Sequence, residues 1–307
     1  MSVHKPTNLY FNITTGCNSA CIFCASNSPS RERHILPTEL IVSAYKKSGI
    51  DKNDEVVLNG GEPTTHPGIS TILTQAIALG ARVTLFTNGR RLSHPKVAKK
   101  ILIPGLHRIS VPLYGSSPTS HDSLTGVRGS FDQTKQGLDN IFDSQKETGY
   151  PRQIEIKLLS IRPSLPEWGD IIRLIHSRWG KPDRVLLSGL ILSNEVSLRK
   201  DILIPSLDEL KKNVSSSLEQ LSEFQIHTIL WNIPLCVIDP VYYPIINDTK
   251  IVNDTILNLY YDPTFPDGIQ VNESEKGDTF CKKCDLTKIC ATDERFFIEL
   301  ERATMDR

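Results

Sequence analysis

Short apolar runs alternate with helix-like segments through the first two thirds of this chain, and this alternation limits the possible folds more than any other feature. The apolar runs have the length of strands, and the segments between them carry apolar residues at helical spacing. Strands that alternate with helices pair in parallel, in an open sheet or a barrel. The predicted strands are 9–15, 55–59, 82–87, 107–113, 153–161 and 184–188. The predicted helices are 37–48, 69–79, 131–147, 168–178 and 207–224.

The alternation stops after about residue 225, where prolines separate two short strand-like runs, 226–231 and 257–261. We therefore expect a fold of the α/β class in two parts. Residues 1–225 are expected to form a partial (β/α)6 barrel of the TIM type. Residues 226–307 are expected to form a small, irregular α+β module.

Composition argues against several classes of protein. The 35 basic residues balance 35 acidic residues, so no overall charge attracts nucleic acid or an anionic membrane. The N-terminal residues lack the apolar core of a signal peptide, and no apolar run is long enough to span a bilayer. We therefore expect a cytoplasmic protein with neither a nucleic acid nor a membrane as its partner.

The seven cysteines form two tight groups with a single cysteine between them. Clustered cysteines in a cytosolic chain of this size indicate metal binding rather than a disulfide framework. The first group follows the first predicted strand with the spacing CxxxCxxC. It can hold three irons of a 4Fe–4S cube and leave the fourth iron open, as catalytic metal sites require. A zinc knuckle or simply buried cysteines are the alternatives. The cysteines are Cys17, Cys21 and Cys24, then Cys236, then Cys281, Cys284 and Cys290.

A second motif, Gly60-Gly61-Glu62-Pro63, directly follows the second predicted strand. Glycines let a ligand approach the backbone closely, and the Glu62 carboxylate can accept hydrogen bonds from an ammonium group. Alone, the motif could be an ordinary turn. The carboxyl ends of parallel strands share one edge of a sheet, however, so this motif and the first cysteine group are expected at the same edge.

Together the two motifs resemble the radical S-adenosylmethionine (radical SAM) superfamily, in which three cysteines bind a catalytic 4Fe–4S cluster whose open iron chelates S-adenosylmethionine (SAM). The resemblance implies that the glycine-rich motif holds the methionine amino group and that Phe23 lies near the nucleoside. Three further strand-end residues are weaker candidates for contact with SAM or substrate, because such residues are often only turns or caps. The implied cofactor-binding residues are Phe23, Gly60, Gly61, Glu62, Pro63, Asn88, Ser110 and Lys157.

The last three cysteines have the spacing CxxC-x5-C, which resembles the auxiliary-cluster modules called SPASM and twitch. Glu294 stands where a full SPASM module has a further cysteine, so the shorter twitch type with one auxiliary 4Fe–4S cluster is expected. Cys236 is then the fourth ligand, or alternatively a catalytic thiol that donates a hydrogen atom to a substrate radical. A structural zinc site with four cysteines would use the same ligands.

The resemblance implies an enzyme that reductively cleaves SAM to a 5′-deoxyadenosyl radical, which then abstracts a hydrogen atom from the substrate. Family analogy favours modification of a ribosomally made peptide, by cross-linking or epimerisation; the alternative is a dehydrogenase or epimerase acting on a sugar or nucleotide. An iron–sulfur electron carrier or redox sensor is a third possibility, but it would not explain the glycine-rich motif. The expected partners are an electron donor such as flavodoxin or ferredoxin, the substrate, and a separate leader-binding protein.

Overall fold

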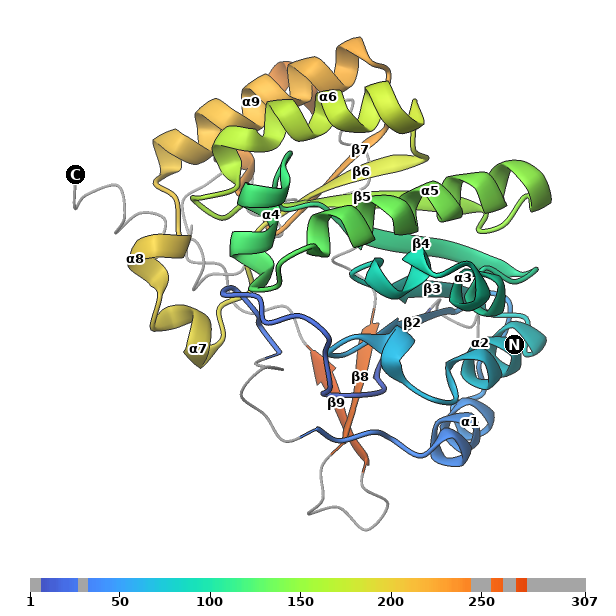
Figure 1. The fold of residues 1–307 in the computed structure, drawn as a ribbon. Helices are drawn as coiled ribbons and strands as arrows, with labels where there is room; N and C mark the ends of the chain where they lie inside the picture. The colour runs from blue at the N-terminus through green and yellow to red at the C-terminus, as the bar shows by residue number, and fades with distance from the viewer. Residues whose placement is uncertain (1–6, 27–32, 244–254, 262–268, 275–307) are drawn as a thin grey trace.

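A computed structural model of the chain describes residues 7–26, 33–243, 255–261 and 269–274. Its core is one nine-stranded sheet with the order β7-β6-β5-β4-β3-β2-β1-β8-β9 (Figure 1). Neighbouring strands are parallel, except that β9 runs antiparallel to β8. The strands are β1 (Thr7–Asn12), β2 (Glu55–Asn59), β3 (Arg82–Phe86), β4 (Leu106–Pro112), β5 (Gln153–Leu159), β6 (Arg184–Ser188), β7 (Thr228–Trp231), β8 (Thr255–Tyr261) and β9 (Ile269–Ser274).

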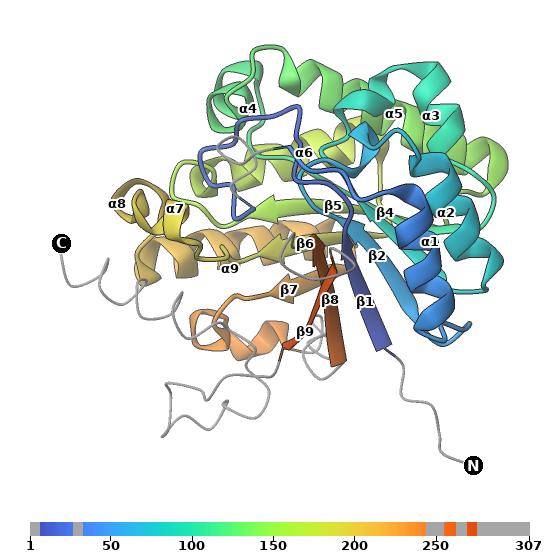
Figure 2. The same ribbon diagram turned by 90° about the horizontal axis from the view of Figure 1, so that it is seen from below.

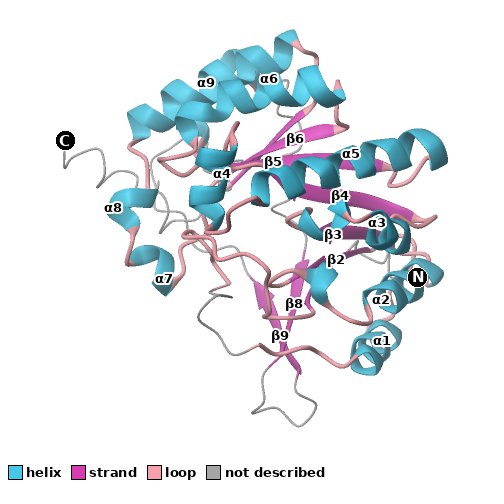
Figure 3. Cartoon of the chain, viewed as in Figure 1, coloured by secondary structure: helices cyan, strands magenta, loops and turns pink. Residues whose placement is uncertain are grey.

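Helices surround the sheet on its outer side, and three short helices lie among the loops at the strand ends (Figure 3). The outer helices are α1 (Thr38–Lys47), α2 (Ile69–Ala78), α3 (Pro95–Ile101), α5 (Ser130–Thr148), α6 (Trp168–Trp179) and α9 (Leu207–Glu223). The short helices are α4 (Pro118–Thr125), α7 (Asn194–Ser197) and α8 (Lys200–Leu203). Within the described residues, no helix is both long enough and apolar enough to cross a membrane.

The two faces of each strand differ, because successive side chains point to opposite sides of a sheet. On the outer face apolar side chains pack against the helices; the rings of Phe11 on β1 and Tyr45 on α1 lie 4.7 Å apart, for example. On the inner face lie charged residues such as Glu155 and Arg184, which pair with each other across β5 and β6. This polar inner face lines the interior that the curved sheet partly encloses.

The predicted α/β fold with a parallel sheet is confirmed. Each of the six predicted strands and five predicted helices is present, with ends shifted by a few residues. The runs expected in a separate C-terminal module behave differently, because β7 joins β6 and β8 joins β1 in the same sheet. The boundary after residue 225 stays a prediction, and Cys281, Cys284 and Cys290 lie outside the described residues.

Candidate functional site

The loop that carries the first three cysteines follows the carboxyl end of β1 and lies against α4 (Figures 1 and 2). Two backbone hydrogen bonds fix it there. The amide of Ala20 donates to the carbonyl of Thr125 at 2.8 Å, and the amide of Ile22 donates to the carbonyl of Leu124 at 3.1 Å. Within the loop, the Ser19 amide donates to the sulfur of Cys17 at 3.3 Å. The cysteines therefore stand on a loop that the barrel holds at its carboxyl edge.

The pairing of β1 with β2 continues beyond the ends of both strands. The amide of Gly61 donates to the carbonyl of Thr14 at 2.7 Å, and the amide of Glu62 donates to the carbonyl of Gly16 at 2.9 Å. Gly16 immediately precedes Cys17, so this extended ladder brings the glycine-rich motif alongside the start of the cysteine loop. The two motifs that the sequence predicts at one edge thus lie side by side.

Both glycines of the motif are needed for this backbone contact. A β-carbon on Gly61 would lie 2.3 Å from the carbonyl oxygen of Gly16, and one on Gly60 would lie 2.4 Å from the carbonyl oxygen of Thr14. Gly60 also has a φ of +130°, which side chains rarely allow. The structure therefore shows that the glycines make room for the chain's own backbone; their contact with a ligand stays a prediction.

The Glu62 carboxylate is buried, with 1% of the residue exposed, and it accepts hydrogen bonds from the residues around it. One oxygen, Oε1, accepts from the Thr64 amide at 3.0 Å, the Thr64 hydroxyl at 2.6 Å and the Thr87 hydroxyl at 2.7 Å. The other oxygen, Oε2, accepts from the Asn88 amide at 2.7 Å. A carboxylate offers about four acceptor sites, two on each oxygen, so a ligand ammonium would bind at Oε2.

Asn88 and Arg90, just after β3, tie this part of the site to the cysteine loop. The side-chain amide of Asn88 donates to the side-chain oxygen of Asn18 at 2.7 Å. The Arg90 guanidinium donates to the backbone carbonyl of Asn18 and to the Ser19 hydroxyl, the latter at 3.0 Å. Asn88 was predicted as a site residue, whereas Arg90 and Thr87 were not. Their place within a few residues of the end of β3 was the available signal.

Burial is the largest influence on the pKa of the Cys17 and Cys21 thiols. It raises the pKa of Cys17 to about 11, with an opposing hydrogen bond from the Ser19 amide. Burial, together with the Cys17 and Cys24 thiols, also raises the pKa of Cys21. Without metal, the Cys17 and Cys21 thiols are therefore protonated at neutral pH. A bound metal must displace these protons, because the thiolate is the ligand.

The three cysteines are a donor set of the kind that binds an iron–sulfur cube. Within the described residues, no three His, Cys, Asp or Glu side chains converge on one metal ion. The three thiolates of a cube bind separate irons, so they need not converge on one point. Cys17 and Cys24 nevertheless lie close enough to Cys21 for their charges to affect its pKa. Cys17, Cys21 and Cys24 would thus hold a cluster through three irons.

Phe23, within the cysteine loop, belongs to a cluster of aromatic rings. Phe23 is buried, and its ring lies 4.5 Å from that of Tyr114, which in turn lies 5.5 Å from the ring of His121. Burial raises the pKa of Tyr114, and the charges of the cysteines and Glu62 raise it further. Tyr114 therefore lies within electrostatic reach of both motifs. Sequence reasoning did not assign it a role, although it closely follows β4.

The remaining predicted residues lie in four different elements. Pro63 is buried in the turn that follows Glu62. Ser110, on the inner face of β4, donates to Oε1 of Glu155 at 2.6 Å. Lys157 lies farther along β5, facing the Trp231 ring. Cys236 lies on a short 3-10 turn after β7, Leu235–Val237, and is exposed.

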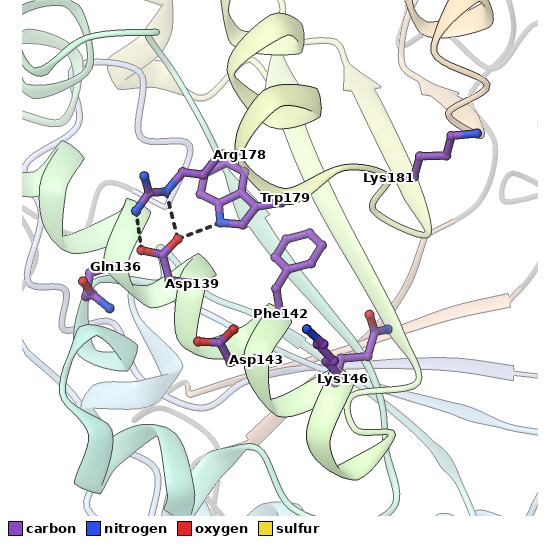
Figure 4. A pocket seen from close by; sticks show the side chains of 9 residues that line it. Gln136, Asp139, Phe142, Asp143, Lys146, Arg178, Trp179 and Lys181 are labelled. Carbon is purple, nitrogen blue, oxygen red and sulfur yellow. Dashed lines mark hydrogen bonds and ion pairs between the residues drawn. The ribbon is translucent and has the colours of Figure 1, made fainter.

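A surface hollow lies elsewhere, on the outer layer between α5 and the end of α6 (Figure 4). Asp139 in its wall accepts from the Arg178 guanidinium at 2.7 Å and from the Trp179 indole at 2.8 Å. The rings of Phe142 and Trp179 stack at 5.8 Å. These side chains contact one another, and none of the predicted site residues lines the hollow. The candidate site is therefore the carboxyl edge of the sheet.

Comparison with known proteins agrees with this placement. Residues 11–151 match the family model of the Radical SAM superfamily. AdoMet-dependent heme synthase of Methanosarcina barkeri is 30% identical over 156 residues, which cover 49% of this chain and 42% of the relative. A probable GTP 3′,8-cyclase of Saccharolobus islandicus is 33% identical over 140 residues, 44% of each protein. The matches thus span less than half the length of these relatives.

Solved structures share the fold. Streptococcus suis SuiB bound to the precursor peptide SuiA superposes with a TM-score of 0.61 at 16% identity, covering 83% of this chain and 57% of SuiB. HydG, a maturase of the [FeFe]-hydrogenase, superposes with a TM-score of 0.51 at 12% identity, covering 74% of this chain and 52% of HydG. The matched residues 11–151 contain both motifs and the strands that position them. This region of the chain is a radical SAM superfamily domain.

Proposed function

We propose that this chain is a radical SAM enzyme that binds a 4Fe–4S cluster through Cys17, Cys21 and Cys24 and cleaves SAM reductively. The observation that carries the proposal is the backbone ladder that places Glu62 beside the start of the cysteine loop. The cluster, when bound, would supply the electron for cleavage. Oε2 of Glu62 would accept a hydrogen bond from the SAM amino group, and Asn88 and Arg90 would keep the loop in place.

The test measures 5′-deoxyadenosine formed by anaerobically reconstituted protein with dithionite and SAM. We expect product from the wild type and none from a variant with Cys17, Cys21 and Cys24 all changed to Ala. Omission of dithionite is the control, because cleavage needs an added electron. A protein that carries a full cluster but forms no 5′-deoxyadenosine would instead support an electron carrier.

We further propose that the substrate is a peptide, modified by cross-linking or epimerisation. The support is the fold likeness to SuiB, which was solved with a precursor peptide and which covers 83% of this chain. A separate protein would bind the leader of the peptide, and a flavodoxin or ferredoxin would deliver electrons. Transfer of deuterium from a labelled candidate peptide into 5′-deoxyadenosine would test the substrate class.

A small-molecule substrate is the second candidate. It is favoured by sequence identity of 30% and 33% to relatives named for heme and GTP. Deuterium transfer from a labelled sugar or nucleotide, with none from peptides, would establish this alternative. Both candidates use the same SAM site and differ only in what occupies the rest of the barrel.

For the C-terminal cysteines we propose one auxiliary 4Fe–4S cluster with Cys236 as its fourth ligand. Cys236 is exposed and follows the carboxyl end of β7, the same edge of the sheet that carries the first three cysteines. A closed, fully ligated cluster cannot bind substrate directly, so its role would be electron transfer to or from the substrate.

A further inference from the structure

The acids on the inner face of the sheet already have partners. The Arg184 guanidinium donates to Oε2 of Glu155 at 2.5 Å, and Ser110 donates to Oε1 of the same carboxylate at 2.6 Å. Arg108 forms an ion pair with Glu55. Glu155 is only 1% exposed, so its charge is neutralised inside the barrel by Arg184 rather than by solvent. Among the residues that the structure describes, these contacts leave the next basic residue along β5 without an acidic partner.

That cation is Lys157. It lies two residues beyond Glu155, so its side chain is on the same inner face of β5. It is half-buried, and its ammonium nitrogen lies 5.7 Å from the centre of the Trp231 ring on β7. Within the described residues this ammonium makes no hydrogen bond and no ion pair. A cation held against an aromatic face in a partly desolvated interior is a site prepared for an anion.

Lys157 and Trp231 belong to the half of the sheet away from the SAM motifs. The sheet order places β5, β6 and β7 on one side of β4, and β3, β2 and β1 on the other. The cysteine loop, Glu62 and Asn88 follow β1, β2 and β3, respectively. With SAM and substrate both bound along the carboxyl edge, SAM would thus lie over one half of the sheet and the substrate over the other.

We propose that Lys157, backed by the Trp231 ring, binds an oxyanion of the substrate, either a carboxylate or a phosphate. This inference rests on the proposed function for the identity of the substrate half. Burial lowers the pKa of Lys157, while the Glu155 carboxylate opposes that change. A bound oxyanion would restore the charge balance that burial disturbs, so binding and full protonation of Lys157 would favour each other.

The experiment is equilibrium dialysis of the reconstituted protein against radiolabelled inorganic phosphate and, separately, radiolabelled acetate, at constant ionic strength. We expect saturable binding of at least one of the two anions to the wild type. Lys157→Gln should weaken that binding by about tenfold or more, because it removes the charge-assisted contact. Lys157→Arg should retain it. Lys146→Gln, which alters an exposed lysine on α5, is the matched control and should bind like the wild type.

The outcomes separate clearly. Tighter binding of phosphate would assign a phosphorylated substrate, tighter binding of acetate a carboxylate, and both support the proposal. Wild-type protein without saturable binding, or Lys157→Gln protein that binds normally, would overturn it. Displacement of the anion by SAM on cluster-loaded protein would assign the site to SAM and also overturn it. Dialysis requires no SAM cleavage, so failure here is distinct from a failure to form 5′-deoxyadenosine.

Discussion

Glu62 shows how a single side chain can serve both the fold and the site. Its position after β2 was predictable from the motif, and its role toward an ammonium group followed from the family resemblance. Two of the four donors that surround it were not predictable, because Thr87 and Asn88 come from the end of the next strand. Only the register of β2 against β3 brings them to the carboxylate. Glu62 therefore links two strand ends before any ligand arrives.

Glu62→Gln should test this structural role. The side-chain NH2 group of Gln would face at least one donor, which is the Asn88 amide on one side or the Thr64 amide and the Thr64 and Thr87 hydroxyls on the other. A buried donor left without its acceptor costs about 1–3 kcal/mol, so the free energy of unfolding should fall by that amount. Denaturant unfolding measures it, with Glu147→Gln at an exposed position as the control. SAM affinity, measured by equilibrium binding, should fall as well.

Equal stability of Glu62→Gln and the wild type would show that the hydrogen bonds to this carboxylate contribute little to the fold. A loss of stability with unchanged SAM affinity would mean that Glu62 holds the strand ends together but does not bind the amino group. Measuring both quantities therefore separates the structural role from the proposed ligand role.

At the scale of elements, helices and strands with strong periodicity were predictable, and short capped helices were not. The predicted strands at 55–59 and 184–188 coincide with β2 and β6. The segment between β4 and α5, by contrast, reads as a polar loop, yet it contains α4. That helix buries few apolar side chains and depends on a capping box between Ser117 and Ser120, with Pro118 in its first turn. Local caps, rather than a hydrophobic stripe, decide its existence.

The junction between β2 and the cysteine loop is an element-scale contact that one methyl group should disturb. In Gly61→Ala the new carbon would lie 2.3 Å from the Gly16 carbonyl oxygen and 2.7 Å from that of Thr15, both backbone atoms. The two chains must separate, at a cost of about 1–3 kcal/mol for overpacking. We expect lower stability in denaturant and a lower iron content after reconstitution, because the cysteine loop begins at this contact.

Gly169→Ala on α6 is the matched control for Gly61→Ala. The nearest atoms to its new carbon are the ends of two flexible side chains at 3.6 Å, and alanine favours helix by up to about 1 kcal/mol over glycine. Its stability should be unchanged or higher, with normal iron content. Normal iron content in Gly61→Ala as well would show that the cysteine loop does not depend on its contact with the glycine-rich motif.

At the scale of the whole molecule, the sequence predicted the class of fold but not the full sheet. The pairing of β8 with β1 joins segments separated by more than 240 residues, with Thr7 opposite Thr255. No local pattern encodes such a contact, since any exposed strand edge can accept a parallel strand. Likewise, Lys157 was predicted only as a weak candidate for contact with SAM or substrate, and its proximity to Trp231 depends on β5, β6 and β7 lying in sequence within one sheet.

If the proposed second cluster forms, the iron content of the protein depends on cysteines from both the first and the last part of the chain. Two cubes of four irons predict about eight irons in reconstituted protein. If Cys236 is a ligand, Cys236→Ala should destabilise the auxiliary cluster, lowering the iron content or changing its electron paramagnetic resonance signal. Cys24→Ala should instead alter the signal of the first cluster, so the two variants control for each other. About four irons together with bound zinc would contradict the auxiliary cluster.

The spectrum of Cys236→Ala also decides between two reactions. A ligand and a hydrogen-atom donor leave different traces, because only the ligand holds iron in place. The exposed position of Cys236 after β7 is compatible with either role. An unchanged auxiliary signal and unchanged iron content would show that the thiol is not a ligand. In that case loss of an epimerised product from Cys236→Ala, with 5′-deoxyadenosine still formed, would identify the thiol as the donor that completes epimerisation.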